Sequence, residues 1–278
     1  MALPGFLALF QANPQQEVGP DGRMPLADHF REFRARLLRS LLVVAVLFGV
    51  WIFFFDTLYD LVYGPYQTAV ERLPEGSTIA TTSGPGGGLM VYLKLSGFAA
   101  VVCAAPYWLY QLWAFVLPGL HPAEKKWSRI FVAIAGPLFL AGVALGYVTL
   151  PKALEVLIGF NPEGLVNLNE FNDFLTFFSR TLLVFGIAFE IPVFVVLLNL
   201  VGVLKGATLG KYRPWVIVGT FIFAAVATPS ADPFTMTIMA VPMVLLFFIS
   251  EAIARVNDRR RARRAASVAA DPDEATVL

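Results

Sequence analysis

The sequence predicts an all-α membrane protein that crosses the bilayer six times. Apolar residues make up 57% of its 278 residues and charged residues only 15%, and the mean hydropathy is +0.68. This composition is typical of membrane proteins and excludes an ordinary soluble domain. Long runs without charged side chains recur along the chain, and about 20 apolar residues are enough for a helix to cross the hydrocarbon core.

A short amphipathic segment, Met24–Arg39, precedes the first apolar run. At helical spacing, Leu26, Phe30, Phe33 and Leu37 fall within one narrow stripe, which arginines flank. We therefore expect a helix that lies along the membrane surface with its arginines at the headgroup level. It should lead directly into the first span.

Six charge-poor runs are the predicted spans, because an ionised group is costly in hydrocarbon. The fifth and sixth charge-free runs, residues 214–231 and 233–250, have 18 residues each. They barely reach across at about 1.5 Å per residue, which favours a locally thinned bilayer. The spans are expected at about residues 38–58, 95–120, 130–150, 181–204, 214–231 and 233–251, within a membrane domain over residues 24–257.

The distribution of Lys and Arg predicts the orientation. Of the 21 basic residues, 17 lie in the N-terminal segment, in the loops after the second and fourth spans, and in the C-terminal tail. The other loops hold only four. Because Lys and Arg gather in cytoplasmic loops, we expect both termini inside and three loops outside.

Two of the predicted outer loops are long, residues 56–94 and 151–180. The first begins with an aromatic, helix-compatible stretch around Pro65 and ends in the glycine-rich run Gly84–Gly88. These glycines lack the Gly-Lys-Ser/Thr ending of a phosphate-binding loop, so a flexible link is the better interpretation. The second loop is expected to form a helix, a turn and a helix.

The two ends of the chain are predicted to lie outside the membrane domain. Residues 1–23 are expected to be a mobile extension. Residues 258–278 contain too few apolar side chains to pack. Their basic half should contact anionic lipid, and their end should be disordered.

Glu190 lies within the fourth predicted span, two residues before Pro192. A carboxylate at membrane depth must face a protein interior or a wet cavity. Pro192 lacks an N–H and frees the carbonyl of Ala188, which favours water or a polar partner nearby. A hydrogen-bonded structural glutamate and a functional one are both compatible with this pattern, and the functional interpretation is favoured.

The predicted topology places Glu32 and Glu124 on the same, cytoplasmic side. Two such carboxylates could hold a pair of guanidinium groups, a geometry that lysine cannot reproduce. However, Glu32 has Arg36 at i+4, and Glu124 is followed by Lys125 and Lys126. Exposed pairs of that kind contribute about 0.3 to 0.5 kcal/mol, and spacing alone favours them over a binding site.

The two histidines sit at matching offsets, His29-x-x-Glu32 and His121-x-x-Glu124. This spacing could direct each pair towards one metal ion, but a surface metal site needs supporting contacts that the sequence does not indicate. Ordinary interfacial residues are favoured. The single Cys103 excludes a disulfide within the chain, and in an apolar run it is best interpreted as a packing residue.

Several short motifs are weak individually but specific in their order and spacing over six spans. Together they resemble the TatC family, the multi-span component of the twin-arginine protein translocase. The motifs are Met24-Pro25-Leu26 with His29, Glu32, Arg34 and Leu37; Tyr110 to Phe115 followed by Pro118-Gly119-Leu120 and Glu124; Gly142, Tyr147 and Pro151; Phe189-Glu190-Ile191-Pro192; and Thr228-Pro229, Asp232 and Ala240-Val241-Pro242.

The resemblance implies a receptor and translocase core, not an enzyme, that recognises folded exported proteins by an arginine pair in their signal peptides. No nucleotide, metal or other cofactor is implied. By the match of motifs, Glu32 and Glu124 would hold the arginine pair. Arg34 and Phe115 would line the same cytoplasmic surface, and Glu190 would be the intramembrane glutamate of the family.

The resemblance also implies the setting of the protein. It places the chain in the cytoplasmic membrane of a bacterium, as a concave helical wall capped by the outer loops. Expected partners are signal peptides, single-span subunits of the TatA and TatB type, further copies of the chain and membrane lipids, but no nucleic acid. His29, Pro65 and Asp232 are further candidate functional residues. Met236 replaces a glutamine found in several members, which weakens the case for a polar partner contact there.

A proton-coupled secondary transporter that uses Glu190 as the proton carrier is the alternative function. Such a protein would favour a midplane pocket and internally repeated halves with interrupted helices, and the sequence shows no repeat. A hydrolase or an intramembrane protease is less compatible still, because no Ser/His or paired-Asp arrangement lies at membrane depth. A purely structural scaffold would leave Glu190 unexplained.

Overall fold

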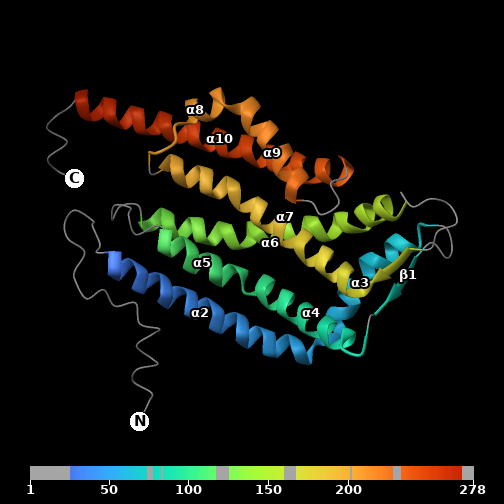
Figure 1. Ribbon diagram of the computed structural model, residues 1–278. Helices are drawn as coiled ribbons and strands as arrows, with labels where there is room; N and C mark the ends of the chain where they lie inside the picture. The colour runs from blue at the N-terminus through green and yellow to red at the C-terminus, as the bar shows by residue number, and fades with distance from the viewer. Residues whose placement is uncertain are drawn as a thin grey trace, which may run out of the picture. The chain divides into compact units, whose positions relative to one another are not determined.

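The chain is helical throughout most of its length (Figure 1). The computed structural model describes residues 26–73, 78–82, 84–116, 125–159, 167–200, 202–227 and 233–270. The chain divides into two compact units, Met1–Gly186 and Ile187–Leu278. The predicted mobile extension, residues 1–23, lies outside the described residues.

The first unit is built from helices α2 to α6, the beginning of α7 and two short strands. Helix α2 packs against α4 and α5, α5 packs against α6, and α3 packs against both α4 and α6. The elements are α2 (Leu26–Phe53), α3 (Phe55–Val70), β1 (Thr78–Thr81), α4 (Gly87–Cys103), α5 (Ala105–Val116), α6 (Lys125–Gly159), β2 (Asn167–Glu170) and α7 (Phe171–Leu200), which continues into the second unit.

The polytopic, all-α fold is confirmed. In the described part of the chain, α4 and α5 together are long and apolar enough to form one broken span. The apolar helix Arg213–Val226 is too short to count as a span by itself. Four helices are long and apolar enough to cross a membrane by themselves: His29–Phe53, Ala133–Gly159, Phe171–Leu200 and Pro233–Arg263. Helix α2 runs without a break from Leu26 to Phe53, so the amphipathic segment is not a separate surface helix. The last residues of the first predicted span, 55–58, belong to α3.

The second predicted span is not a single straight helix. The chain bends by 55° between α4 and α5, next to Pro106, which cannot donate to the preceding turn and disfavours a helical conformation at Ala105. The indole Nε1 of Trp108 donates to the carbonyl of Val101 at 3.0 Å. This side chain therefore supplies a donor where the backbone ladder is interrupted.

The two long loops that we predicted to lie outside are joined by a parallel strand pair that we did not predict. Thr78 is in register with Asn167, and Thr81 with Glu170. The hydroxyl groups of Tyr66 and Thr78 lie 3.3 Å apart, which ties β1 to α3. The flexible link expected before Lys94 is thus wrong in part, because β1 is ordered and α4 already begins at Gly87.

Helix α6 runs through Pro151 to Gly159, nine residues beyond the predicted end of the third span. The extension is held by packing, since Leu150 and Leu154 are buried in the core of the first unit. Helices α6 and α7 approach closely at Gly142, where an added Cβ would meet the carbonyl oxygen of Phe185 at 2.5 Å. Small residues permit such contacts between membrane helices.

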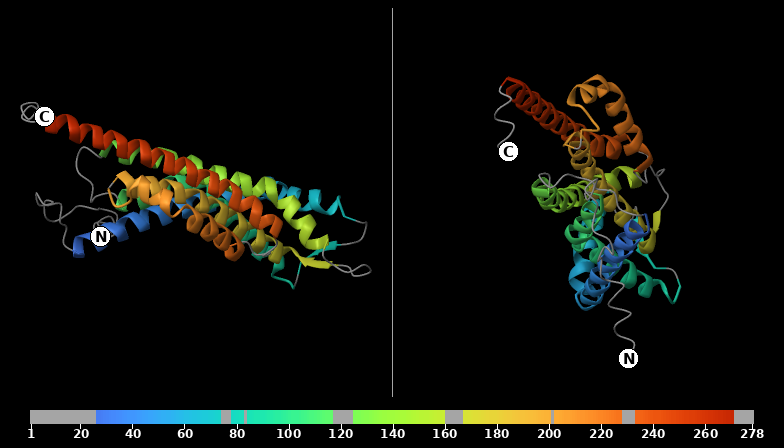
Figure 2. Two further views of the ribbon diagram at one scale, coloured as in Figure 1. Left: turned by 90° about the horizontal axis from the view of Figure 1, so that it is seen from above. Right: turned by 90° about the vertical axis from the view of Figure 1, so that its left-hand side faces the viewer.

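The second unit contains the rest of α7, α8 (Gly206–Lys211), α9 (Arg213–Ala227) and α10 (Pro233–Ala270). Helix α10 packs against α8 and α9 and is one long helix (Figure 2). Residues 258–270 are therefore helical, although we expected a disordered tail from Asp258. The segment is rich in Ala and Arg, which have high helix propensity, and Arg261 donates to the carbonyl of Leu200 at 2.8 Å.

Candidate functional site

The predicted cytoplasmic motifs of α2 and α5 meet in the first unit. The ring of His29 stacks on that of Phe115, with centroids 4.4 Å apart and an interplanar angle of 22°. Phe33 contacts the same ring at 5.3 Å between centroids. His29 and Phe115 are 86 positions apart in the sequence, so the packing of α2 on α5 assembles this part of the candidate site.

Glu32 is held beside this aromatic cluster by Arg36. Arg36 donates from Nε and Nη2 to Oε1 of Glu32 at 2.9 and 2.6 Å, and from Nη1 to Oε1 of Gln111 at 3.2 Å. The side chains of Arg36 and Glu32 are 20% and 14% exposed. The i,i+4 pair that we weighed against a binding site does form, but it is more shielded than an exposed helix pair and is linked to α5.

The face of α2 that does not pack against the rest of the unit is apolar and accessible next to this pair. Phe30 is 69% exposed and Leu37 is 45% exposed, whereas Ala35 is fully buried against the rest of the unit. The predicted stripe therefore does not pack into the core of the described chain. Arg34 is exposed on the same helix.

Two of the predicted site residues, Glu124 and Asp232, lie outside the described residues, as does His121. His29 is engaged with Phe115, and no group of three or more His, Cys, Asp and Glu side chains in the described part of the chain could hold a metal ion. Pro65 is buried inside α3.

Glu190 lies in α7, within the second unit, and its side chain is half-buried. Pro192 is accommodated inside the same helix. Ser250 of α10 donates to the carbonyl of Pro192 at 3.3 Å and to that of Leu246 at 2.9 Å. The proline region is thus in polar contact with α10, although the bond reaches the carbonyl of Pro192 itself and not the carbonyl of Ala188 that the proline frees.

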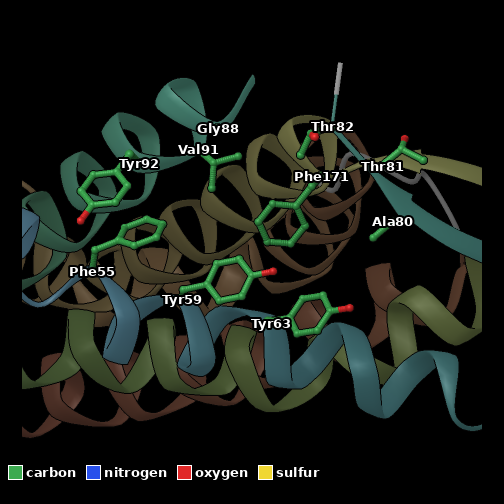
Figure 3. A pocket seen from close by; sticks show the side chains of 10 residues that line it. All are labelled: Phe55, Tyr59, Tyr63, Ala80, Thr81, Thr82, Gly88, Val91, Tyr92 and Phe171. Atoms are coloured by element: carbon green, nitrogen blue, oxygen red, sulfur yellow. The ribbon is translucent and has the colours of Figure 1, made fainter. Parts of the chain in front are cut away.

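An aromatic pocket of about 550 Å³ lies between α3, α4, β1 and the start of α7 (Figure 3). The rings of Phe55 and Tyr92 stack at 3.7 Å, and those of Tyr59 and Tyr63 stack at 5.4 Å. Burial, with smaller contributions from Tyr63 and Asp60, raises the pKa of Tyr59, so its phenol stays neutral at ordinary pH. Sequence analysis identified the aromatic stretch but not the strand that closes the pocket.

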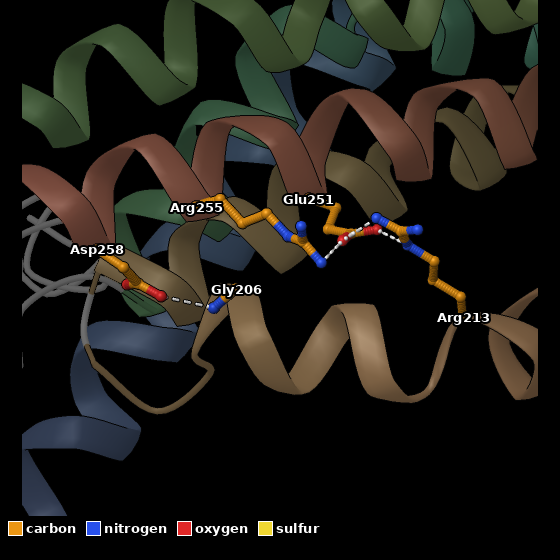
Figure 4. Close-up of polar contacts among 5 residues, drawn as sticks. All are labelled: Gly206, Arg213, Glu251, Arg255 and Asp258. Carbon is orange, nitrogen blue, oxygen red and sulfur yellow. Dashed lines mark hydrogen bonds and ion pairs between the residues drawn. The ribbon is translucent and has the colours of Figure 1, made fainter.

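Sequence analysis also missed a buried carboxylate at Glu251. It is 2% exposed and binds Arg213 and Arg255 (Figure 4). The available signal was a Glu at the end of an apolar run with an Arg four residues later. The contact with Arg213, 38 residues away, was not predictable from spacing.

The chain is similar to known proteins over most of its length. The family model for the Sec-independent protein translocase protein TatC matches residues 28–242. TatC of Frankia casuarinae is 41% identical over 251 residues, which cover 88% of this chain and 69% of the relative. TatC of Xylanimonas cellulosilytica is 39% identical over 250 residues, 89% of this chain and 90% of the relative. TatC of Escherichia coli K12 is 34% identical over 232 residues, 83% and 88% of the two chains.

A solved structure shares the fold. The crystal structure of the twin-arginine translocase receptor TatC superposes with a TM-score of 0.66 at 28% identity, and the match covers 82% of this chain and 98% of that one. The same receptor crystallised in the detergent DDM gives a TM-score of 0.67 at 29% identity, over 81% and 99% of the two chains. The chain belongs to the TatC family of Sec-independent protein translocase proteins.

Proposed function

We propose that this TatC-family chain is the translocase receptor that binds the arginine pair of a signal peptide on the α2–α5 surface. Glu32 supplies one carboxylate, and Glu124 supplies the second by the match of motifs. The observation that carries the proposal is the shielded contact of Glu32 with a guanidinium group, that of Arg36, beside the aromatic cluster of His29 and Phe115.

The chemistry of this surface suits an arginine-bearing peptide. Both bonds from Arg36 to Glu32 reach Oε1, so a second guanidinium can approach through Oε2. The Phe115 ring can stack against a planar guanidinium, which an ammonium group does less well. The exposed Phe30 and Leu37 offer apolar contacts to the hydrophobic part of a signal peptide.

Binding of a signal peptide to the purified full chain tests this function. A peptide with Arg-Arg should bind the native protein, and the same peptide with Lys-Lys should bind poorly. Glu32→Gln should weaken Arg-Arg binding by about 1.5 to 3 kcal/mol, the range for a hydrogen bond to a charged group. Glu71→Gln, at an exposed carboxylate after α3, is the matched control. Equal binding of both peptides, or equal effects of the two substitutions, would contradict the proposal.

We also propose that the chain spans the cytoplasmic membrane six times with both termini inside. We propose that its partners there are single-span subunits of the TatA or TatB type. The segregation of Lys and Arg supports this orientation. In a Cys103→Ala background, Asn167→Cys should react with an impermeant thiol reagent in intact cells and Ser267→Cys should not. Labelling of Ser267→Cys would mean that the C-terminus lies outside, and it would contradict the proposed orientation.

A further inference from the structure

One end of the second unit carries an excess of positive charge around a buried carboxylate (Figure 4). Arg213 donates from Nε to Oε2 of Glu251 at 2.6 Å and from Nη2 to Oε1 at 2.7 Å. Nη2 of Arg255 lies 2.7 Å from Oε1. Two guanidinium groups therefore share one carboxylate. Their side chains are 43% and 44% exposed, so part of each faces outward.

This charged cluster is held rigidly. The backbone N–H of Gly206 donates to Oδ2 of Asp258 at 2.6 Å, and Nδ2 of Asn199 donates to Oδ1 at 2.9 Å. A Cβ added at Gly206 would lie only 2.8 Å from the backbone nitrogen of Arg255. Helix α8 is thus fixed against α10, which keeps the basic groups in place without a ligand.

Aromatic residues typical of a membrane interface lie close to Arg213 in the sequence. Nζ of Lys211 lies 5.8 Å from the ring centroid of Tyr212. Tyr212 and Trp215 are 50% and 74% exposed. Tyr and Trp beside Lys and Arg at the end of an apolar helix are typical of the headgroup level. This end of α9 is therefore expected to lie among lipid headgroups.

An apolar groove of about 280 Å³ begins one helical turn from the cluster. Val216 lines it three residues after Arg213, and Phe247 lines it four residues before Glu251. Its wall on α9 extends to Phe223, about 10 Å along the axis at 1.5 Å per residue. The hydroxyl of Thr220 bonds to the Val216 carbonyl of its own helix at 2.8 Å, so this polar group is already satisfied.

We propose that the groove and the cluster together bind one anionic phospholipid. Lys211 and the outward-facing part of Arg213 hold the phosphate, and part of one acyl chain occupies the groove. Basic sites between membrane helices suit anionic headgroups, and the groove is close enough to serve the same molecule. An acyl chain is a single file of methylenes, and the residues that line the groove are almost all apolar.

Lipid retention by the purified full chain tests the site. We add phosphatidylglycerol or phosphatidylcholine with the same acyl chains to the protein in a mild detergent. Retained lipid is then measured by mass spectrometry, and the unfolding temperature is recorded. Phosphatidylglycerol should be retained and should raise the unfolding temperature, and phosphatidylcholine should do so much less.

Two pairs of variants separate the parts of the site. Gly219 lines the groove and a Cβ there meets no atom within 4 Å, so the Cβ of Gly219→Leu has room. The added side chain should occupy the groove and abolish retention. Ile222→Leu, at a side chain that is 60% exposed and outside the groove, is the control. Lys211→Gln should weaken phosphatidylglycerol binding about fivefold, while Lys211→Arg should preserve it.

Equal retention of both lipids would overturn headgroup recognition. Unchanged phosphatidylglycerol binding in Gly219→Leu would overturn occupation of the groove by an acyl chain. If that variant kept the lipid but lost a co-purifying single-span protein, the groove would be a protein contact and the proposal would be wrong. Lys211→Gln acts at an exposed side chain, so its result stands even if Gly219→Leu fails to fold.

Discussion

Two glutamates, each with an arginine four residues later, have different environments. Glu251 is 2% exposed, and two arginines bind its two oxygen atoms. Glu32 is 14% exposed, and the bonds from Arg36 reach only Oε1. The same i,i+4 pattern thus occurs in two settings. Arginines of its own unit bind both oxygen atoms of Glu251, whereas Oε2 of Glu32 accepts no bond from Arg36 and is the atom proposed to bind a further cation. Spacing identifies the pair, but tertiary contacts decide what the pair can do.

The largest expected difference between the two glutamates concerns stability. Glu251→Gln leaves two guanidinium groups without their shared counter-charge, and we expect a loss of about 2 kcal/mol in the free energy of unfolding. This is less than the roughly 3 to 5 kcal/mol for breaking a fully buried pair, because both arginines are partly exposed. Glu32→Gln should cost about 0.5 kcal/mol. Unfolding by SDS in mixed micelles, followed by circular dichroism, measures both.

If Glu251→Gln and Glu32→Gln lowered the free energy of unfolding equally, the proposed difference between the two carboxylates would be wrong. Glu71→Gln, at an exposed position, gives the baseline for a surface change and should alter the free energy of unfolding by less than about 0.5 kcal/mol.

Glu190 extends the comparison to a carboxylate inside a span. Glutamine keeps a polar, hydrogen-bonding side chain of the same size, so Glu190→Gln should retain export of a folded cargo. Glu190→Ala should reduce export about tenfold, equivalent to about 1.4 kcal/mol. If Gln and Ala abolish export equally while Asp restores it, ionisation is required and a proton-carrier role gains support.

Gln111 allows a further test, because it links the Glu32–Arg36 pair to α5. It accepts from Arg36 at 3.2 Å and is only 5% exposed. Gln111→Leu leaves one shielded donor unsatisfied and should reduce the free energy of unfolding by about 1 kcal/mol. Gln67→Leu, at an exposed glutamine on α3, is the matched control. Equal effects would show that the link contributes nothing specific.

The features that sequence predicted well depend on local pattern. The Glu32–Arg36 pair and the helical, membrane-spanning character follow from hydrophobic periodicity and i,i+4 spacing. The strand pair of Thr78–Thr81 with Asn167–Glu170 does not, because short strands are stabilised by their partner. The partner here is nearly 90 residues away in the chain.

Tertiary contacts also explain two other differences from the prediction. The basic segment after Asp258 lacks apolar residues, which suggested disorder, yet Asp258 and Arg261 bond to the region where α7 ends and α8 begins. Glu251 marks the end of the sixth predicted span, and its ion pair with Arg213 was not predicted because the two residues are distant in sequence. Polar networks between helices leave no periodic signal, and for that reason the site proposed on the second unit was not predicted.

The central claim is direct contact between Glu32 and an arginine of the signal peptide. A double-mutant cycle that combines Glu32→Gln with Arg→Lys in the peptide isolates this interaction. We predict a coupling energy of about 1 kcal/mol or more in peptide binding to the purified chain. Strictly additive effects at both peptide arginines would contradict the claim and leave Glu32 as a structural partner of Arg36.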